Sequence, residues 1–286
     1  MALNPLPSLM GGESGFSIVK VGGAVVEDPA QLTAFMDEFV KVEGPKVLVH
    51  GGGRTATQLA KQLGIESQMV GGRRVTDAET LRIVTMVYGG LVNKNIVAQL
   101  QARGVNALGL TGADLNIIRA HRRPVAAEGV DFGFVGDVDS ADGTRLLQLL
   151  REGITPVIAP LTHDGQGHLL NTNADTMAQT VATAIAQALD IPREEEELVP
   201  LTEKAESVSL TFCFELPGVL RNPNDPTTLI PHLTEPLFHT LVADGIIAGG
   251  MIPKLENAFA ALRAGVASVR ITNIHNLQGG TLVMNN

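Results

Sequence analysis

The chain has 286 residues, of which 44% are hydrophobic, and a formal net charge of −9. This acidic balance argues against nucleic acid as the main partner, although a small anion needs only a local positive site. The chain has no apolar run of about 18 residues and no signal-peptide pattern at its start, so we expect a cytoplasmic protein without a membrane partner and with a loose tail over residues 1–15.

The first glycine turn follows an apolar stretch, FSIVKVGGAV, at residues 16–25. It predicts a buried strand that brings Lys20 to one edge of a sheet, followed by Gly22, Gly23 and a helix. VLVHGGG at 47–53 repeats this arrangement. Glycines let the backbone approach a ligand closely and helix N-termini offer unpaired N–H groups, so the two turns predict a phosphate site.

The third segment reads GGRRVTDAETLRIV from Gly71. Thr76 and Glu79 have the spacing of a capping box ahead of a long helix. Gly89-Gly90 inside that helix indicates either a kink or a close approach by another helix. We expect close packing, across the interface of a homodimer.

The rest of the chain continues to alternate between strand and helix patterns. An acidic excursion covers 192–206. We expect strands at 106–110, 155–161, 207–216, 267–272 and 281–284, a hairpin flap at 117–137, and helices at 144–151, 236–242 and 255–264. Repeated βα alternation predicts an α/β fold, a three-layer αβα sandwich with a mainly parallel central sheet and its site at the carboxyl ends of the strands.

Two enzyme classes can be weighed from motifs alone. GxxxxGK[ST] is absent, which excludes a P-loop kinase. Gly51-x-Gly53-x-x-Ala56 loosely matches a dinucleotide fingerprint, but no acidic residue ends a second strand at the expected distance, which weakens a dehydrogenase reading. The histidines show no ligand spacing, and His50, at the end of an apolar strand, is interpreted as structural.

Two lysines stand out because each lies near a Gly-Gly pair at a sheet-to-helix junction. Lys20 precedes Gly22-Gly23, and Lys254 follows Gly249-Gly250. Unpaired cations are unusual in such places unless an anion binds there. Asn171, Asn173 and Asp175 stand at the start of another helix, where polar residues most often serve as caps.

Seven motifs together resemble the N-acetylglutamate kinases of the amino acid kinase family. They are KVGGAV, VHGGG, GRRVT, GFVGDV, LLNTNAD, PGV and GGMIPK, in this order between residues 16 and 284. The resemblance implies the amino acid kinase fold, with an acyl-amino-acid lobe at 16–167 and an ATP lobe at 168–286. It also implies phosphorylation of the side-chain carboxylate of N-acetyl-L-glutamate by ATP with Mg²⁺, as in arginine biosynthesis.

The resemblance also assigns roles to residues. Lys20 and Lys254 would stabilise the transferring phosphoryl group, and Asp175 would hold both lysines, which makes these three the catalytic set. The other roles fall to the glycine amides and to three polar side chains: phosphate binding by Gly22 and Gly23, and substrate binding by Gly52, Gly53, Arg74, Asn171 and Asn173. No protein-held metal is expected. A carboxylate with a pKa of about 4.3 is already ionised at neutral pH, so no catalytic base is needed.

The chain departs from the family pattern at two places. Phe214-Glu215-Leu216 replaces the family's Thr-Asp-Val in the nucleotide lobe, so adenine and ribose contacts are not carried over. The tail lacks the helix associated with arginine-inhibited hexamers, which favours an unregulated dimer. N-succinyl-L-glutamate remains an alternative substrate. Two alternative functions also remain, a non-catalytic ligand sensor and a nicotinamide dehydrogenase.

Overall fold

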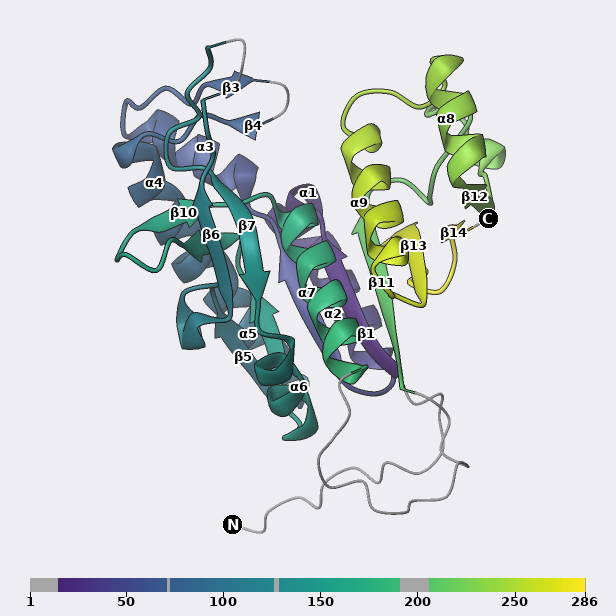
Figure 1. Cartoon of the computed structure of the whole chain (residues 1–286), viewed down its shortest axis with the longest axis horizontal. Helices are drawn as coiled ribbons and strands as arrows, with labels where there is room; N and C mark the ends of the chain where they lie inside the picture. Colours follow the sequence, from purple (N-terminus) through teal and green to yellow (C-terminus); the bar gives the residue numbers. More distant parts are fainter. Residues whose placement is uncertain (1–14, 71–72, 126–128, 191–205, 286) are drawn as a thin grey trace.

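Two strands with few polar residues, β1 (Gly15–Val21) and β2 (Lys46–His50), lie side by side in the interior of the main sheet. The computed structural model describes residues 15–70, 73–125, 129–190 and 206–285 (Figure 1). Of the tail expected over 1–15, only Gly15 is described, and it begins β1. Of the acidic excursion, only Glu206 is described, and the rest lies outside these ranges.

The main sheet has eight strands in the order β12-β14-β13-β11-β1-β2-β8-β5. Neighbouring strands are parallel except β13 and β14, which are antiparallel. The remaining strands of this sheet are β5 (Ala107–Leu110), β8 (Thr155–Ile158), β11 (Ser207–Phe214), β12 (His232–Thr234), β13 (Ser268–Asn273) and β14 (Thr281–Met284). The α/β prediction with a mainly parallel sheet is confirmed, and the sheet runs without a break from the N-terminal strands to the C-terminal ones.

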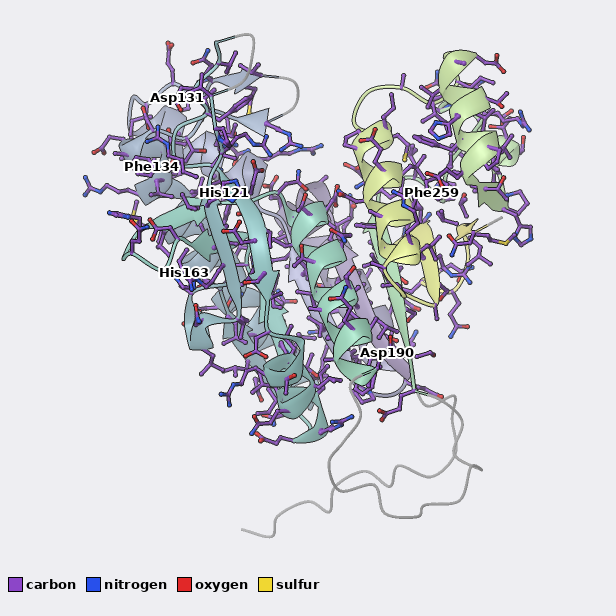
Figure 2. All side chains as sticks on the ribbon, in the orientation of Figure 1. His121, Asp131, Phe134, His163, Asp190 and Phe259 are labelled. Atoms are coloured by element: carbon purple, nitrogen blue, oxygen red, sulfur yellow. The ribbon has the colours of Figure 1, made fainter. Side chains whose placement is uncertain are left out.

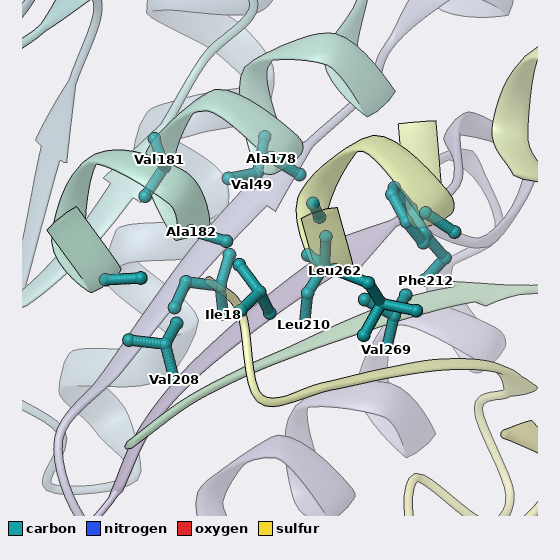
Figure 3. Close-up of a cluster of buried hydrophobic side chains, with 14 of the residues drawn as sticks. Ile18, Val49, Ala178, Val181, Ala182, Val208, Leu210, Phe212, Leu262 and Val269 are labelled. Atoms are coloured by element: carbon teal, nitrogen blue, oxygen red, sulfur yellow. The ribbon is translucent and has the colours of Figure 1, made fainter. Parts of the chain in front are cut away.

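Helices cover both faces of the sheet, as the alternating side chains of β1 require. Ile18 packs into one apolar core and Val19 into the other. The core around Ile18, part of which Figure 3 shows, also takes residues from α6 (Gly143–Arg151), α7 (Ala174–Leu189), α8 (Glu235–Ala243) and α9 (Met251–Arg263). The core around Val19 takes residues from α1 (Gly23–Glu27), α2 (Pro29–Lys41), α3 (Gly53–Gln62), α4 (Ala78–Val84) and α5 (Asn93–Ala102). The three-layer sandwich is confirmed.

A second sheet, in the order β10-β9-β6-β7, lies beside the main one. It consists of β6 (Ile118–Arg122), β7 (Gly136–Ala141), β9 (Leu161–His163) and β10 (Leu169–Asn171), while β3 (Met69–Val70) and β4 (Arg73–Arg74) form a separate hairpin. The flap expected at 117–137 is therefore part of a four-stranded sheet. The single strand expected at 155–161 is wrong, because the chain leaves the main sheet after Ile158 and enters the second at Leu161.

The capping box expected at Thr76 and Glu79 is wrong. Asp77 is the N-cap of α4, and its carboxylate accepts a hydrogen bond from the Thr80 N–H at 2.7 Å. Thr76 is fully buried, and its hydroxyl donates to the Arg74 carbonyl. A threonine and an aspartate both fit an N-cap, and the aspartate one position later takes the role here.

The Gly89-Gly90 pair lies in a π-helical segment, Thr85–Val92, between α4 and α5. A Cβ on Gly89 would lie 3.4 Å from Leu161 and 3.7 Å from Thr111, whereas a Cβ on Gly90 would meet nothing within 4 Å. Within the described residues, Gly89 therefore packs closely against β9 and the loop after β5 rather than against another helix.

Two boundaries near the expected site differ from the sequence analysis. α9 begins at Met251 rather than at 255, which places Lys254 in its first turn. β11 ends at Phe214, so Glu215 lies beyond the strand. In the described part of the chain, none of the helices has the length and apolar character needed to span a bilayer.

Candidate active site

The carboxyl ends of β1 and β2 and the first turns of α7 and α9 lie at one edge of the main sheet (Figure 1). Asn173 is the N-cap of α7, and its side chain accepts hydrogen bonds from the N–H groups of Asp175 and Thr176. The helix ends at Leu189, and its C-cap Asp190 lies at the end opposite Asn173 (Figure 2). The cap thus fixes Asp175 in the first turn of α7, next to the end of β1.

Asp175 binds the two lysines that the sequence singled out. Its Oδ1 atom lies 2.7 Å from Lys20 Nζ, and its Oδ2 atom lies 2.8 Å from Lys254 Nζ. Their side chains are 10% and 12% exposed, respectively, so both ammonium groups are largely removed from water. One carboxylate between two ammonium groups leaves an excess positive charge at a site that is largely shielded from water. Such a charge favours the binding of an anion.

The pKa values of these groups follow from burial and mutual charge. Burial raises the pKa of Asp175, but the charges of Lys20 and Lys254 outweigh burial and hold that pKa well below its usual range. Burial lowers the pKa of Lys254, Lys20 lowers it further, and Asp175 opposes both effects. The carboxylate is therefore ionised throughout the neutral range and acts as a counter-charge rather than as a base.

Two phenylalanines lie under the second lysine. Lys254 Nζ is 5.4 Å from the ring centre of Phe212 and 5.6 Å from that of Phe214, within cation–π distance. Phe214 and Glu215, the first two residues of the departure from the family pattern, line a cavity together with Lys20 and Lys254. The departure therefore lies at the site itself and contributes to holding Lys254.

The two glycine turns contact each other at the same cavity. A Cβ on Gly51 would lie 3.2 Å from the Gly23 nitrogen, so a larger residue at 51 would push the turns apart. Gly22, Gly23, Gly52 and Gly53 all line the cavity. Gly22, however, donates its N–H to the Cys213 carbonyl at 2.9 Å, so the expectation of an available Gly22 amide is wrong.

His50 has the structural role expected for it. It is fully buried, and its Nδ1–H donates to the Gly51 carbonyl at 2.7 Å. Asn93, at the start of α5, donates its side-chain amide to His50 Nε2 and to the Val157 carbonyl. With both ring nitrogens paired, His50 fixes the second glycine turn to α5 and β8.

The same burial predicts a pH dependence of stability. It lowers the pKa of His50 from 6.5 to about 4. The unfolded chain binds a proton at His50 below pH 6.5 and the folded chain does not, so the stabilisation is complete above pH 6.5 and is lost as the pH falls towards 4. The expected loss is about 3 kcal/mol of unfolding free energy.

Denaturant unfolding at several pH values checks this dependence. His50→Gln should flatten the profile between pH 6.5 and 4, whereas His239→Gln, which removes an exposed imidazole, should leave it as in the parent chain. Equal slopes in the parent chain and in His50→Gln would contradict the assignment.

A second cavity adjoins the glycines and contains the residues expected to bind substrate. Arg74, Asn171 and Asn173 all line it. Arg74 is held by Ser67, Thr57 and the Gly53 carbonyl at 2.7 to 2.8 Å, and the Asn171 amide donates to Thr76. The expected residues thus come together around two adjoining cavities that share Gly51, Gly52, Gly53 and Arg74.

Among the side chains of this second cavity that were not assigned to a site from the sequence, three carry a charge or a hydroxyl suited to binding an anion. They are Arg73, Tyr88 and Arg123. Both Asp137 oxygens accept from Arg123. In the sequence, Arg73 belongs to a basic turn and Arg123 follows a predicted strand, far apart along the chain. The hairpin β3–β4 and the second sheet bring these two arginines together. Tyr88 carried no functional signal, because its spacing from Val84 indicates only an inward-facing position on the helix.

No group of three or more metal-binding side chains occurs among the described residues. The donor set at the lysine pair is cationic, and it suits an anionic ligand such as a polyphosphate.

Comparisons with known proteins identify the family of the chain. The model of the amino acid kinase family matches residues 16–190. A protein of Bacteroides thetaiotaomicron named acetylglutamate kinase is 57% identical over 90% of this chain and 92% of its own length. A Bacteroides fragilis protein of the same name is 55% identical over 93% of this chain and 96% of its own length.

Among solved structures, smu.665 from Streptococcus mutans superposes with a TM-score of 0.71 at 26% identity, covering 94% of this chain and 98% of that one. The chain belongs to the amino acid kinase family.

Proposed function

We propose that the protein is an ATP-dependent kinase that phosphorylates the side-chain carboxylate of N-acetyl-L-glutamate, as in arginine biosynthesis. The observation that carries this proposal is the pair of Lys20 and Lys254 on Asp175, at a cavity lined by two glycine turns. The names of the relatives support the choice of substrate.

The reaction is a direct transfer. A carboxylate oxygen of the substrate attacks the γ-phosphorus of ATP, and the bond to the leaving ADP oxygen breaks. Both reactants are anions, so the protein has to supply positive charge and alignment rather than a base. Lys20 approaches the phosphoryl oxygens from β1 and Lys254 from α9, and Asp175 positions both ammonium groups.

The remaining residues bind the two substrates. Gly23, Gly52 and Gly53 donate amides to the phosphates and the reacting carboxylate, while Gly22 contributes space. Arg74 and Asn171 bind the substrate's α-carboxylate and neighbouring groups, and Asn173 acts mainly through its cap. The lobe at 16–167 holds the acyl-glutamate and the lobe at 168–286 holds ATP, which enters as its Mg²⁺ complex.

We also propose that the protein works in the cytoplasm as a homodimer. Met86 and Leu91 on the π-helical segment and Leu108 on the edge strand β5 are 54%, 53% and 38% exposed. Exposed apolar groups beside an open sheet edge favour pairing with a second copy. Light scattering after gel filtration should give the mass of two chains, and Leu91→Asp should reduce it to one.

A second candidate substrate is N-succinyl-L-glutamate, which one observation favours. Burial lowers the pKa of Arg73, and the nearby charge of Arg123 lowers it further. Among the residues described, Arg123 pairs with Asp137, whose charge also opposes the lowering of the Arg73 pKa, and Arg73 forms no ion pair of its own. A carboxylate at the end of a longer acyl group would offer Arg73 a counter-charge.

ATP consumption with each of the two acyl-glutamates tests the proposed function. Turnover that depends on N-acetyl-L-glutamate supports it, and a preference for the succinyl compound selects the second candidate. Binding of NAD(H) without ATP turnover would indicate a dehydrogenase, and ligand binding without any turnover would indicate a sensor.

Arg74→Ala should raise KM for the acyl-glutamate and change kcat much less. Arg74 binds a part of the substrate that does not react, so its loss weakens ground state and transition state alike. Steady-state kinetics at saturating ATP measure both constants. Arg82→Gln, which alters an exposed arginine on α4, is the matched control, and an unchanged KM in Arg74→Ala would remove Arg74 from the site.

A further inference from the structure

Tyr88 lies in the π-helical segment Thr85–Val92 and points inwards, like the buried Val84 one turn before it. A π-helical turn adds a residue relative to an α-helix and shifts the following side chains to a different face, which is frequent at functional sites. Here Met86 and Leu91 face outwards, whereas Tyr88 is only 5% exposed and lines the second cavity.

The ring of Tyr88 packs against the second glycine turn. A Cβ on Gly52 would lie 3.1 Å from Tyr88 Cδ1 and 3.3 Å from Cε1, so only glycine lets the backbone lie flat on this ring. A Cβ on Gly53 would lie 3.9 Å from the Tyr88 hydroxyl. The ring therefore supports the glycine turn and directs the hydroxyl to the place where the two cavities adjoin.

The hydroxyl and the Arg74 guanidinium border the same glycine, because a Cβ on Gly53 would also lie 3.8 Å from Arg74 Nη2. Burial raises the pKa of the phenol, and the charge of Arg74 opposes this effect. Arg74 donates its hydrogen bonds to Ser67, Gly53 and Thr57. A guanidinium can only donate, so Arg74 cannot accept the phenol proton. Among the described residues, none accepts that proton. Because buried tyrosine hydroxyls usually find a partner, the cavity is where an acceptor belongs.

We propose that Tyr88 is a substrate-binding residue whose hydroxyl donates a hydrogen bond to the carboxylate that Arg74 binds. This inference rests on the proposed function, because the carboxylate is that of the acyl-glutamate. An arginine and a phenol side by side offer two donors to one carboxylate, and a carboxylate accepts from both. The side chain also holds Gly52 in place, so its removal has to be separated from removal of the hydroxyl.

Tyr88→Phe makes that separation, because it keeps the ring against Gly52 and removes only the hydroxyl. We expect KM for N-acetyl-L-glutamate to rise about tenfold, the size of a lost hydrogen bond to a charged group, with KM for ATP and kcat nearly unchanged. Tyr88→Leu removes the ring as well and should also lower kcat. Arg82→Gln should change none of these constants.

The sequence offers a direct readout that does not depend on turnover. Tyr88 is the chain's single tyrosine, and the chain has no tryptophan. The near-ultraviolet absorption and fluorescence of the phenol therefore report on this one position. Adding N-acetyl-L-glutamate, which does not absorb there, should perturb the signal of the parent chain and saturate, and Arg74→Ala should shift that saturation to higher concentrations.

The outcomes separate the inference from the proposed function. Absence of turnover and of any binding of N-acetyl-L-glutamate by calorimetry would overturn the proposed function. Normal turnover with an unchanged KM in Tyr88→Phe, or calorimetric binding without any change in the phenol signal, would overturn the role of Tyr88 alone. A raised KM together with a saturable phenol signal supports it.

Discussion

Lys254→Ala should lower kcat by about two orders of magnitude or more while leaving the chain folded. The carboxylate and the phosphoryl group repel each other more strongly as they approach, and the positive charge of Lys254 offsets this repulsion. Loss of the ammonium group therefore acts mainly on the transition state. Lys20→Ala should show a loss of similar size, because both lysines share Asp175 and face one cavity.

Quenched-flow or steady-state assays of ADP formation at saturating substrates measure this loss. Lys61→Ala removes an exposed lysine from α3 and controls for the change in net charge. Near-normal kcat in Lys254→Ala or in Lys20→Ala would refute the role assigned to that lysine.

Asp175→Asn should reduce both activity and stability. The substitution leaves two buried ammonium groups without their counter-charge, which costs about 3 kcal/mol or more of unfolding free energy. The lysines also lose the contacts that position them, so kcat should fall as well. Added pyrophosphate should raise the melting temperature of this variant more than that of the parent chain, because an anion replaces the missing charge.

Thermal unfolding with and without pyrophosphate measures this difference. Asp190→Asn changes an exposed aspartate at the other end of the same helix and serves as the control (Figure 2). Equal stabilisation of the parent chain and Asp175→Asn by pyrophosphate would show that Asp175 does not balance the lysine charges.

Much of the fold could be predicted because local patterns determine it. FSIVKVGGAV and VLVHGGG are apolar runs that end in glycine, and such runs become interior parallel strands whose carboxyl ends meet at one edge. That placed Lys20 and the glycines correctly. The position of Lys254 followed from its own glycine pair, although α9 begins earlier than expected.

Other features depend on contacts between distant residues and could not be read from local patterns. The side-chain pairing of Lys20 and Lys254 on Asp175 joins β1, α7 and α9. The Gly22 N–H is not free to bind phosphate, because β11 lies next to β1 and its Cys213 carbonyl accepts that N–H. The sequence of a single strand does not reveal which strand lies beside it. Tyr88 was missed because helical periodicity indicates only that it faces inwards, whereas its contact with Gly52 joins distant parts of the chain.

The central claim is that two cations from different parts of the chain act on one phosphoryl group. A structure of the protein with N-acetyl-L-glutamate and the Mg²⁺ complex of a non-hydrolysable ATP analogue tests it most directly. The amino groups of Lys20 and Lys254 should both lie within about 3.2 Å of oxygens on the terminal phosphoryl group or on the bridge to it. A terminal phosphate bound elsewhere, with the two lysines still paired only to Asp175, would contradict the claim.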